Sequence, residues 1–134
     1  MVMSNDQYLS SAEDQISVKT VLVVEDDEDI GALIAQAIEL ETPFRALHVT
    51  DGFQALKKVS NLKPNLFLLD YRLPDTNGIK LYDALHAIDG LEHVPAIMIS
   101  ANLPTQEVQK RKLPSLKKPF ELDELLQIIG KVIA

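Results

Sequence analysis

The sequence predicts an α/β fold with a doubly wound, five-stranded parallel sheet. Three observations lead to this prediction: the chain has the length of one domain, 134 residues; short apolar runs alternate with longer segments of helical period; and polar residues follow directly after several of these runs. A hydrophobic fraction of 46% and a charged fraction of 25% are typical of a folded globular protein.

The expected strands are short and rich in aliphatic or β-branched residues. They cover residues 21–25, 44–49, 65–70, 96–100 and, more weakly, 113–117. Three of them, at 21–25, 65–70 and 96–100, are apolar almost throughout, as strands covered on both faces must be. Five βα units with right-handed crossovers then place every strand's carboxyl end at one edge of the sheet.

Between the runs, apolar residues recur on one helical face, and each such stripe is expected to pack on the sheet. The stripes comprise Ile30, Leu33, Ile34, Ala37 and Ile38; Ala55, Leu56 and Val59; Leu81, Leu85 and Ile88; and Leu122, Leu125, Leu126, Ile129 and Val132. The last helix follows Pro119, which is compatible with a helix start.

Composition excludes several classes of protein. With no cysteine the chain has no disulfide or thiolate metal site, and it carries no secretory signal, so a cytoplasmic location is expected. The longest apolar runs are far too short to span a membrane. A net charge of −7 argues against direct nucleic-acid binding. Residues 1–18 are polar and read as a flexible extension, leaving 19–134 as the domain.

Polar residues collect at the ends of the predicted strands, where α/β proteins carry their chemistry. In chain order they are Glu25, Asp26, Asp27, Asp70, Ser100 and Lys118. Asp26 or Asp27 alone could simply cap the following helix. Asp70 ends a buried run, where an unpartnered charge is costly. The three histidines, His48, His86 and His93, are isolated in the sequence and are assigned surface or packing roles.

Clustered carboxylates repel one another unless a cation is present. Mg²⁺ prefers one or two carboxylates together with a phosphate oxygen, which Asp26 and Asp70 could offer. A carboxylate beside Mg²⁺ and a lysine can also attack phosphorus and form an aspartyl phosphate. Lys118 and the Ser100 hydroxyl would then share the phosphoryl oxygens with the metal.

Four segments resemble the signature blocks of the receiver domains of two-component response regulators. They are VLVVEDD at 21–27, LDYRLPDTNG at 69–78, IMISA at 97–101 and KKPF at 117–120. The spacings, 44 residues from Asp26 to Asp70 and 30 from Asp70 to Ser100, are those usual in that family. The resemblance covers residues 19–134 and implies a flavodoxin-like (βα)5 fold with strand order 2-1-3-4-5.

The resemblance implies a role for each residue at the strand ends. Asp70 matches the phosphoacceptor, Asp26 the direct Mg²⁺ ligand and Glu25 its neighbour acting through water. The backbone carbonyl of Arg72 would be a further metal ligand. Ser100 and Lys118 match the residues that contact the phosphoryl group, and Ala101 is the small residue beside it. The Lys118–Pro119 bond resembles one that is cis in this family.

The sequence departs from the family pattern in two places. Only 18 residues separate Ser100 from Lys118, about four fewer than usual, so the fourth helix should be short. Ser115 stands where the family generally has an aromatic residue. The sequence therefore does not predict the family's usual coupling between that aromatic residue and the Ser100 hydroxyl. It also does not predict that the fourth helix is the output surface.

The expected function is a signalling domain that accepts a phosphoryl group from a histidine kinase or a histidine phosphotransfer protein. No turnover of an external substrate is expected. Because the chain ends after the fifth helix, output should pass through an unidentified protein partner; a dimer is left open. The alternative is a small Mg²⁺-dependent phosphatase using Asp70, but such enzymes need a second aspartate where Arg72 stands. A third alternative is a flavodoxin that binds FMN. The acidic residues Glu25, Asp26 and Asp27 argue against it, because they would repel the phosphate of that cofactor.

Overall fold

The computed structural model describes residues 18–133, which form a five-stranded, all-parallel sheet with order β2-β1-β3-β4-β5. The predicted fold class and strand order are confirmed. The strands are β1 Thr20–Val24, β2 Arg45–Val49, β3 Leu66–Asp70, β4 Ala96–Ser100 and β5 Ser115–Lys117. The helices are α2 Glu28–Glu41, α3 Gly52–Lys58, α4 Gly78–His86, α5 Thr105–Lys110 and α6 Leu122–Ile133.

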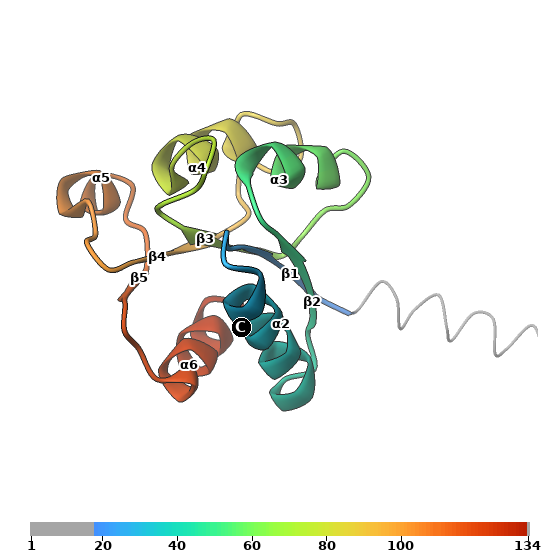
Figure 1. Cartoon of the computed structure of the whole chain (residues 1–134). Helices are drawn as coiled ribbons and strands as arrows, with labels where there is room; N and C mark the ends of the chain where they lie inside the picture. The colour runs from blue at the N-terminus through green and yellow to red at the C-terminus, as the bar shows by residue number, and fades with distance from the viewer. Residues whose placement is uncertain (1–17, 134) are drawn as a thin grey trace, which may run out of the picture.

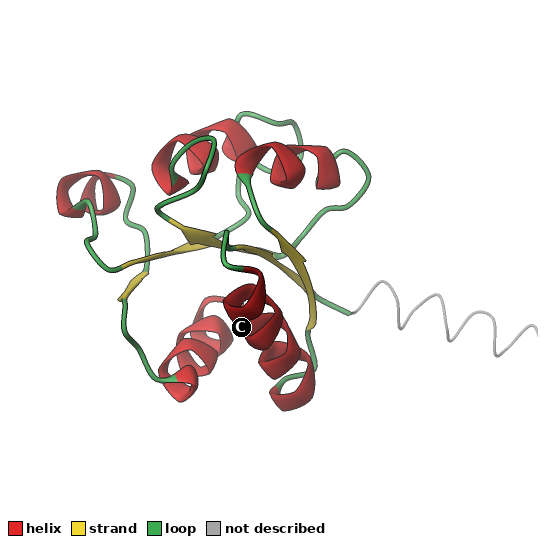
Figure 2. Cartoon of the chain, viewed as in Figure 1, coloured by secondary structure: helices red, strands yellow, loops and turns green. Residues whose placement is uncertain are grey.

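The helices form a layer on each side of the sheet. In Figure 1, α3, α4 and α5 cover one face, while α2 and α6 cover the other. Figure 2 shows the strands as a thin central layer between the two groups of helices. Right-handed crossovers between parallel strands produce this arrangement, because successive helices must change face where the chain reverses its direction across the sheet.

The central strands supply side chains to both layers. Residues of β1 alternate: Leu22 and Val24 pack under α3 and α4, whereas Val21 and Val23 pack under α2 and α6. All of β3 and β4 is buried. Because neither face of these strands meets water, they need no alternation of polar and apolar residues. The sheet core is thus two apolar layers, and in β1, β3 and β4 the polar residues stand only at the strand ends.

Helix α5 spans six residues, which confirms the predicted short fourth helix. It is attached to α4 by Arg111, whose Nε and Nη2 donate to the two carboxylate oxygens of Asp83 at 2.9 and 2.8 Å. The same guanidinium donates to Glu107 Oε1 at 2.7 Å. These hydrogen bonds lower the pKa of Asp83 and raise that of Arg111. The bidentate pair of Arg111 with Asp83 therefore links the end of α5 to α4.

Part of the predicted helix packing is wrong. Ile30 and Leu33 are 42% and 58% exposed, and Leu56 is also exposed, whereas Ile34 and Ile38 are buried as expected. A helix lying on a sheet buries a stripe about 100° wide, and the apolar stripe of α2 is wider than that. The excess residues are exposed at its edge.

Several predicted boundaries move by one or two residues. The first strand begins at Thr20 and ends before Glu25, and the fifth is confined to Ser115–Lys117. The expected extension, residues 1–18, lies outside the described residues except for Val18. Among the described helices, none has the length and apolar character needed to cross a membrane.

Candidate functional site

The two adjacent aspartates in the loop after β1, Asp26 and Asp27, have different surroundings. Asp27 is the N-cap of α2, and its Oδ1 accepts from Ile30 N at 3.0 Å. An aspartate in this position satisfies an otherwise free helix N–H group. Asp26 is exposed and Glu25 is 4% exposed. The helix cap is therefore Asp27, which leaves Asp26 available at the strand end.

Asp70 ends β3 and is 6% exposed. Its Oδ1 accepts from Arg72 N at 3.4 Å. The backbone that follows packs tightly, because a Cβ on Gly78 would lie 2.5 Å from Met98 Sδ and 2.9 Å from the Asp70 carbonyl oxygen. Only glycine permits this close approach of α4 to the end of β3. The carboxylate of Asp70 is thus held at a defined point of the sheet edge.

Lys118 connects the two buried carboxylates. Its Nζ lies 3.0 Å from Glu25 Oε1 and 3.2 Å from Asp70 Oδ2. Burial alone would lower the pKa of Lys118, but the hydrogen bond to Glu25 and the charges of Asp70 and Glu25 outweigh burial. The pKa of Lys118 is therefore raised above its usual value. The lysine stays charged and offsets part of the local negative charge. Its peptide bond to Pro119 is cis, as predicted.

Glu25, Asp26 and Asp70 converge within a few ångströms. Each offers a carboxylate oxygen, and these oxygens all lie within 4.8 Å of one another. Three carboxylates face a single ammonium, so the cluster keeps an excess of negative charge. An all-oxygen, acidic donor set that opens to solvent through Asp26 suits Mg²⁺, which is a hard cation. The residues present therefore fit the metal that the sequence analysis expected.

The other predicted site residues lie at the same edge of the sheet. Ser100 is buried, and its Oγ accepts from Asn102 N at 3.1 Å. Ala101 is exposed beside it. Arg72 is exposed, and its backbone bridges to that of Asn77. Hydrogen bonds link Asp70 to Arg72 N and to Lys118 Nζ, but within residues 18–133 none links Ser100 to the carboxylates.

Two residues near this edge make contacts that the sequence analysis did not predict. Asp75 accepts from Gly52 N and Phe53 N, both at 2.9 Å. These bonds lower the pKa of Asp75 and attach the loop after β3 to the start of α3. His48 Nε2 lies 2.8 Å from the carbonyl oxygen of Glu25. No local pattern signals either contact, because each partner lies more than twenty residues away in the sequence.

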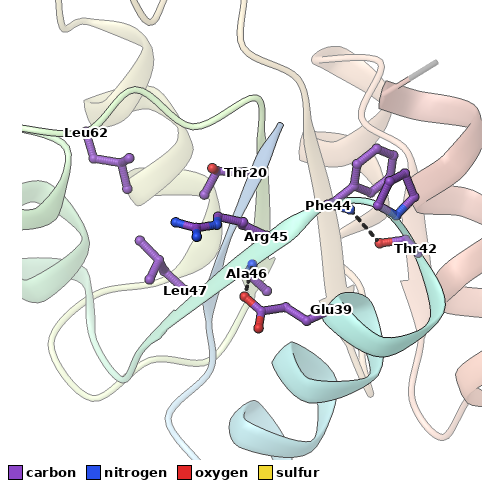
Figure 3. Close-up of a pocket in the computed structure, with 9 residues that line it drawn as sticks. Thr20, Glu39, Thr42, Phe44, Arg45, Ala46, Leu47 and Leu62 are labelled. Carbon is purple, nitrogen blue, oxygen red and sulfur yellow. Dashed lines mark hydrogen bonds between the residues drawn. The ribbon is translucent and has the colours of Figure 1, made fainter. Parts of the chain in front are cut away.

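Two hollows lie in different parts of the fold. One, of about 440 Å³, lies next to Lys118 and is lined mainly by apolar residues, among them Ile30, Leu33, Pro119 and Phe120. The other, of about 500 Å³, is at the amino ends of β1 and β2. In Figure 3 the Glu39 carboxylate in that second hollow points to the backbone of Ala46, whose N–H donates to Glu39 Oε2 at 3.0 Å. None of the predicted site residues lines it.

Comparison with protein families identifies one matching model, described as response regulator receiver domain, over residues 21–130. Among curated proteins, sporulation initiation phosphotransferase F of Bacillus subtilis (strain 168) is 28% identical over 117 residues, which are 84% of this chain and 92% of that protein. The DNA-binding response regulator MtrA of Mycolicibacterium paratuberculosis is 34% identical over 110 residues. These are 79% of this chain and 47% of MtrA, so the chain spans about half of MtrA.

Among solved structures, one similar chain is the receiver domain of the sensor histidine kinase PA1611 from Pseudomonas aeruginosa PAO1. The TM-score is 0.74 at 26% sequence identity, with 87% of this chain and 98% of that chain covered. That structure has a magnesium ion coordinated in its active-site cleft.

Proposed function

The chain belongs to the response regulator receiver domain family, and from this premise we propose that Asp70 is its phosphoacceptor. The observation that carries the proposal is the position of Asp70: a buried carboxylate at a strand end, 3.2 Å from Lys118 Nζ and within 4.8 Å of two further carboxylates. As a receiver domain the chain functions in two-component signalling. We take residues 19–134 as the receiver unit.

The proposed reaction is transfer from a phosphohistidine. A carboxylate oxygen of Asp70 attacks phosphorus, the P–O bond forms, and the P–N bond breaks with its electron pair leaving on the donor imidazole. The product is an acyl phosphate on Asp70. Lys118 already contacts Asp70, and it can pair with the negative charge of the transferred phosphoryl group, because its pKa is raised and it stays protonated. The Ser100 hydroxyl at the end of β4 is proposed to donate to a phosphoryl oxygen.

We propose that Asp26 and Asp70 hold Mg²⁺ directly, with the Arg72 carbonyl as a further ligand and Glu25 acting through water. Bound there, the cation supplies charge neutralisation to a site with more carboxylates than ammonium groups. Glu25 has the smaller direct role because Lys118 Nζ already occupies its Oε1 and Asp27 N donates to its Oε2. Asp26 is exposed and free of these contacts, which supports its assignment as a ligand.

The apolar hollow beside Lys118 supports a proposal about the phosphoryl donor. Receiver domains interact with histidine kinases or phosphotransferases, and a donor histidine must approach Asp70 closely. We propose that the donor protein packs on Ile30 and Leu33, which are exposed apolar residues bordering this hollow. Leu33→Asp should then slow transfer from the partner protein and leave phosphorylation by acetyl phosphate unchanged. If Leu33→Asp accepts the phosphoryl group from the partner protein as fast as wild type does, this surface is excluded as the docking site.

We propose that the chain signals without turning over an external substrate. The phosphatase alternative needs a second acidic group two residues after the nucleophile, and Arg72 occupies that position. An arginine cannot act as a general base there. The net charge of −7 supports the further proposal that the chain itself does not bind nucleic acid. A cytoplasmic location and output through a downstream protein partner stay predictions.

Intact mass after incubation with acetyl phosphate and Mg²⁺ tests the proposed acceptor. Wild type should gain the mass of one phosphoryl group, and Asp70→Asn should gain none. Asp27→Asn is the matched control, because it changes a carboxylate three positions from the strand end that serves as a helix cap. An adduct that persists in Asp70→Asn would exclude Asp70 as the acceptor.

A further inference from the structure

We propose that His48 is a positioning residue for the metal-binding loop: through the Glu25 carbonyl it orients the peptide that leads into Asp26. The inference rests on the proposed function, in which Asp26 is a Mg²⁺ ligand. The observation that carries it is the 2.8 Å contact between His48 Nε2 and the carbonyl oxygen of Glu25.

The direction of this hydrogen bond follows from its chemistry. A backbone carbonyl can only accept, so His48 Nε2 must carry the proton and donate. His48 lies on β2, opposite Val23 of β1, and its neighbour Val49 accepts from Glu25 N at 3.1 Å. Strand β2 therefore holds Glu25 from both sides of its backbone, through a main-chain bond at the nitrogen and a side-chain bond at the carbonyl.

Helix α2 has a specific space for the imidazole. A Cβ added to Gly31 would lie 1.9 Å from His48 Nε2 and 2.2 Å from Cε1. Any side chain at this buried helical position would displace the ring. Glycine in a helix interior is unfavourable by roughly 0.5–1 kcal/mol relative to alanine. The space it leaves is filled by the ring of His48, which links β2, α2 and the loop that begins at Glu25.

The bonded carbonyl has a direct connection to the metal site. The carbonyl of Glu25 and the N–H of Asp26 belong to one rigid peptide plane. Fixing the carbonyl oxygen therefore fixes the plane from which the Asp26 side chain departs. The carboxylate of Glu25 is fixed separately by Lys118 and by Asp27 N. Of the contacts described for this loop, the bond from His48 is the one that holds the Glu25–Asp26 peptide itself from outside the loop.

A purely structural role for His48 makes a different prediction. If the ring only fills space beside Gly31, its removal lowers the melting temperature and leaves Mg²⁺ affinity unchanged. If it orients the peptide before Asp26, Mg²⁺ affinity falls, and a residue that restores the hydrogen bond restores the affinity. Groups that orient metal ligands affect metal binding even though they do not contact the ion.

The test is Mg²⁺ titration of the full chain by calorimetry, with folding checked by circular dichroism. His48→Leu keeps an apolar side chain of similar bulk but cannot donate, and its Kd for Mg²⁺ should rise about fivefold, the size expected for one lost hydrogen bond. His48→Gln places an amide N–H near the Nε2 position and should bind within about twofold of wild type. Gly31→Ala should weaken binding like His48→Leu, because it displaces the ring.

Asp26→Ala separates this proposal from the function on which it rests. If wild type binds no Mg²⁺, or Asp26→Ala binds as tightly as wild type, the proposed metal site itself is wrong. If Asp26→Ala loses binding while His48→Leu keeps wild-type affinity, only the role of His48 is overturned. His48→Gln binding Mg²⁺ as weakly as His48→Leu would overturn it too. Should His48→Leu fail to fold, Gly31→Ala supplies the same comparison with the imidazole still present.

Discussion

The two ends of the sheet carry similar polar groups but use them differently. At the carboxyl ends of β1 and β3, Glu25 and Asp70 are 4% and 6% exposed, and one lysine serves both. At the amino ends of β1 and β2, Glu39 is exposed, and its carboxylate accepts the free edge N–H of Ala46. Each end borders a hollow. Of the two, the carboxyl end is the one where several carboxylates lie together with fewer positive charges than negative ones.

The contrast shows how a charged residue can be assigned to structure or to chemistry. Glu39 covers a backbone group that an edge strand would otherwise expose, a common way of protecting sheet edges. Nothing about it requires a further partner. The carboxylates at the opposite end are close to one another, so a cation lowers their energy. We therefore expect the carboxyl ends of β1 and β3, where negative charge is in excess, to respond to Mg²⁺, to pH and to phosphorylation.

The largest expected effect is on Mg²⁺ binding. Mg²⁺ at about 100 times its Kd should stabilise wild type by roughly 2–3 kcal/mol through mass action, and Asp26→Ala should lose nearly all of this gain. Glu39→Ala is the matched control at the other end of the sheet, and it should keep the full gain. Melting temperatures with and without Mg²⁺ measure both. A Mg²⁺ response that survives in Asp26→Ala would remove the distinction between the two ends.

The next effect is on stability without metal. Lys118→Met leaves Glu25 and Asp70 buried without their ammonium partner, and the free energy of unfolding should fall by about 2 kcal/mol, the size expected for lost hydrogen bonds between charged groups. Lys57, an exposed lysine in the last turn of α3, provides the control: Lys57→Met should change stability by less than about 0.5 kcal/mol. Urea unfolding in chelator measures both variants. Similar losses in the two would mean that Lys118 makes no important pairing.

Stability at alkaline pH tests the same lysine by its titration. The pKa of Lys118 is raised in the folded state by its partners Glu25 and Asp70, so its contribution is complete below the unfolded pKa of about 10.4. That contribution is lost as pH rises through the higher folded value. The difference in unfolding free energy between wild type and Lys118→Met should therefore shrink above about pH 10.5. A difference that stays constant from pH 8 to 11.5 would contradict the pairing.

The smallest effect is expected at the amino end of the sheet. Glu39→Gln keeps a carbonyl oxygen that can accept from Ala46 N–H, so stability should change by less than about 0.5 kcal/mol. Glu39→Ala removes the acceptor, but solvent can reach the exposed edge, and the loss should stay near 1 kcal/mol. Urea unfolding measures both. A loss as large as that of Lys118→Met would mean that the two ends do not differ as described.

Much of this contrast could be predicted from the sequence. Parallel strands end at a common edge, so Asp26, Asp70 and Lys118 could be placed together once the strands were located. The order of the strands came from the family resemblance rather than from periodicity. The short α5 followed from counting residues between Ser100 and Lys118. Local patterns and fixed spacings carry this kind of information.

What the sequence did not predict depends on packing between distant segments. The contact of His48 with Glu25 requires the absence of a side chain at Gly31, which no periodicity signals. The exposure of Ile30 and Leu33 depends on how much of α2 the sheet can cover. The choice of Asp27 as helix cap was open from sequence, and it is decided by the backbone geometry at the start of α2.

The most direct test of the central claim is to locate the phosphoryl group on the chain. After reaction with acetyl phosphate and Mg²⁺, borohydride reduces an aspartyl phosphate to homoserine, and tandem mass spectrometry of the peptides then identifies the modified position. Homoserine at position 70, and no phosphorylated histidine or serine, is the expected result. Homoserine at position 26, or a stable phosphoryl group on His48 or Ser100, would contradict the assignment of Asp70 as the acceptor.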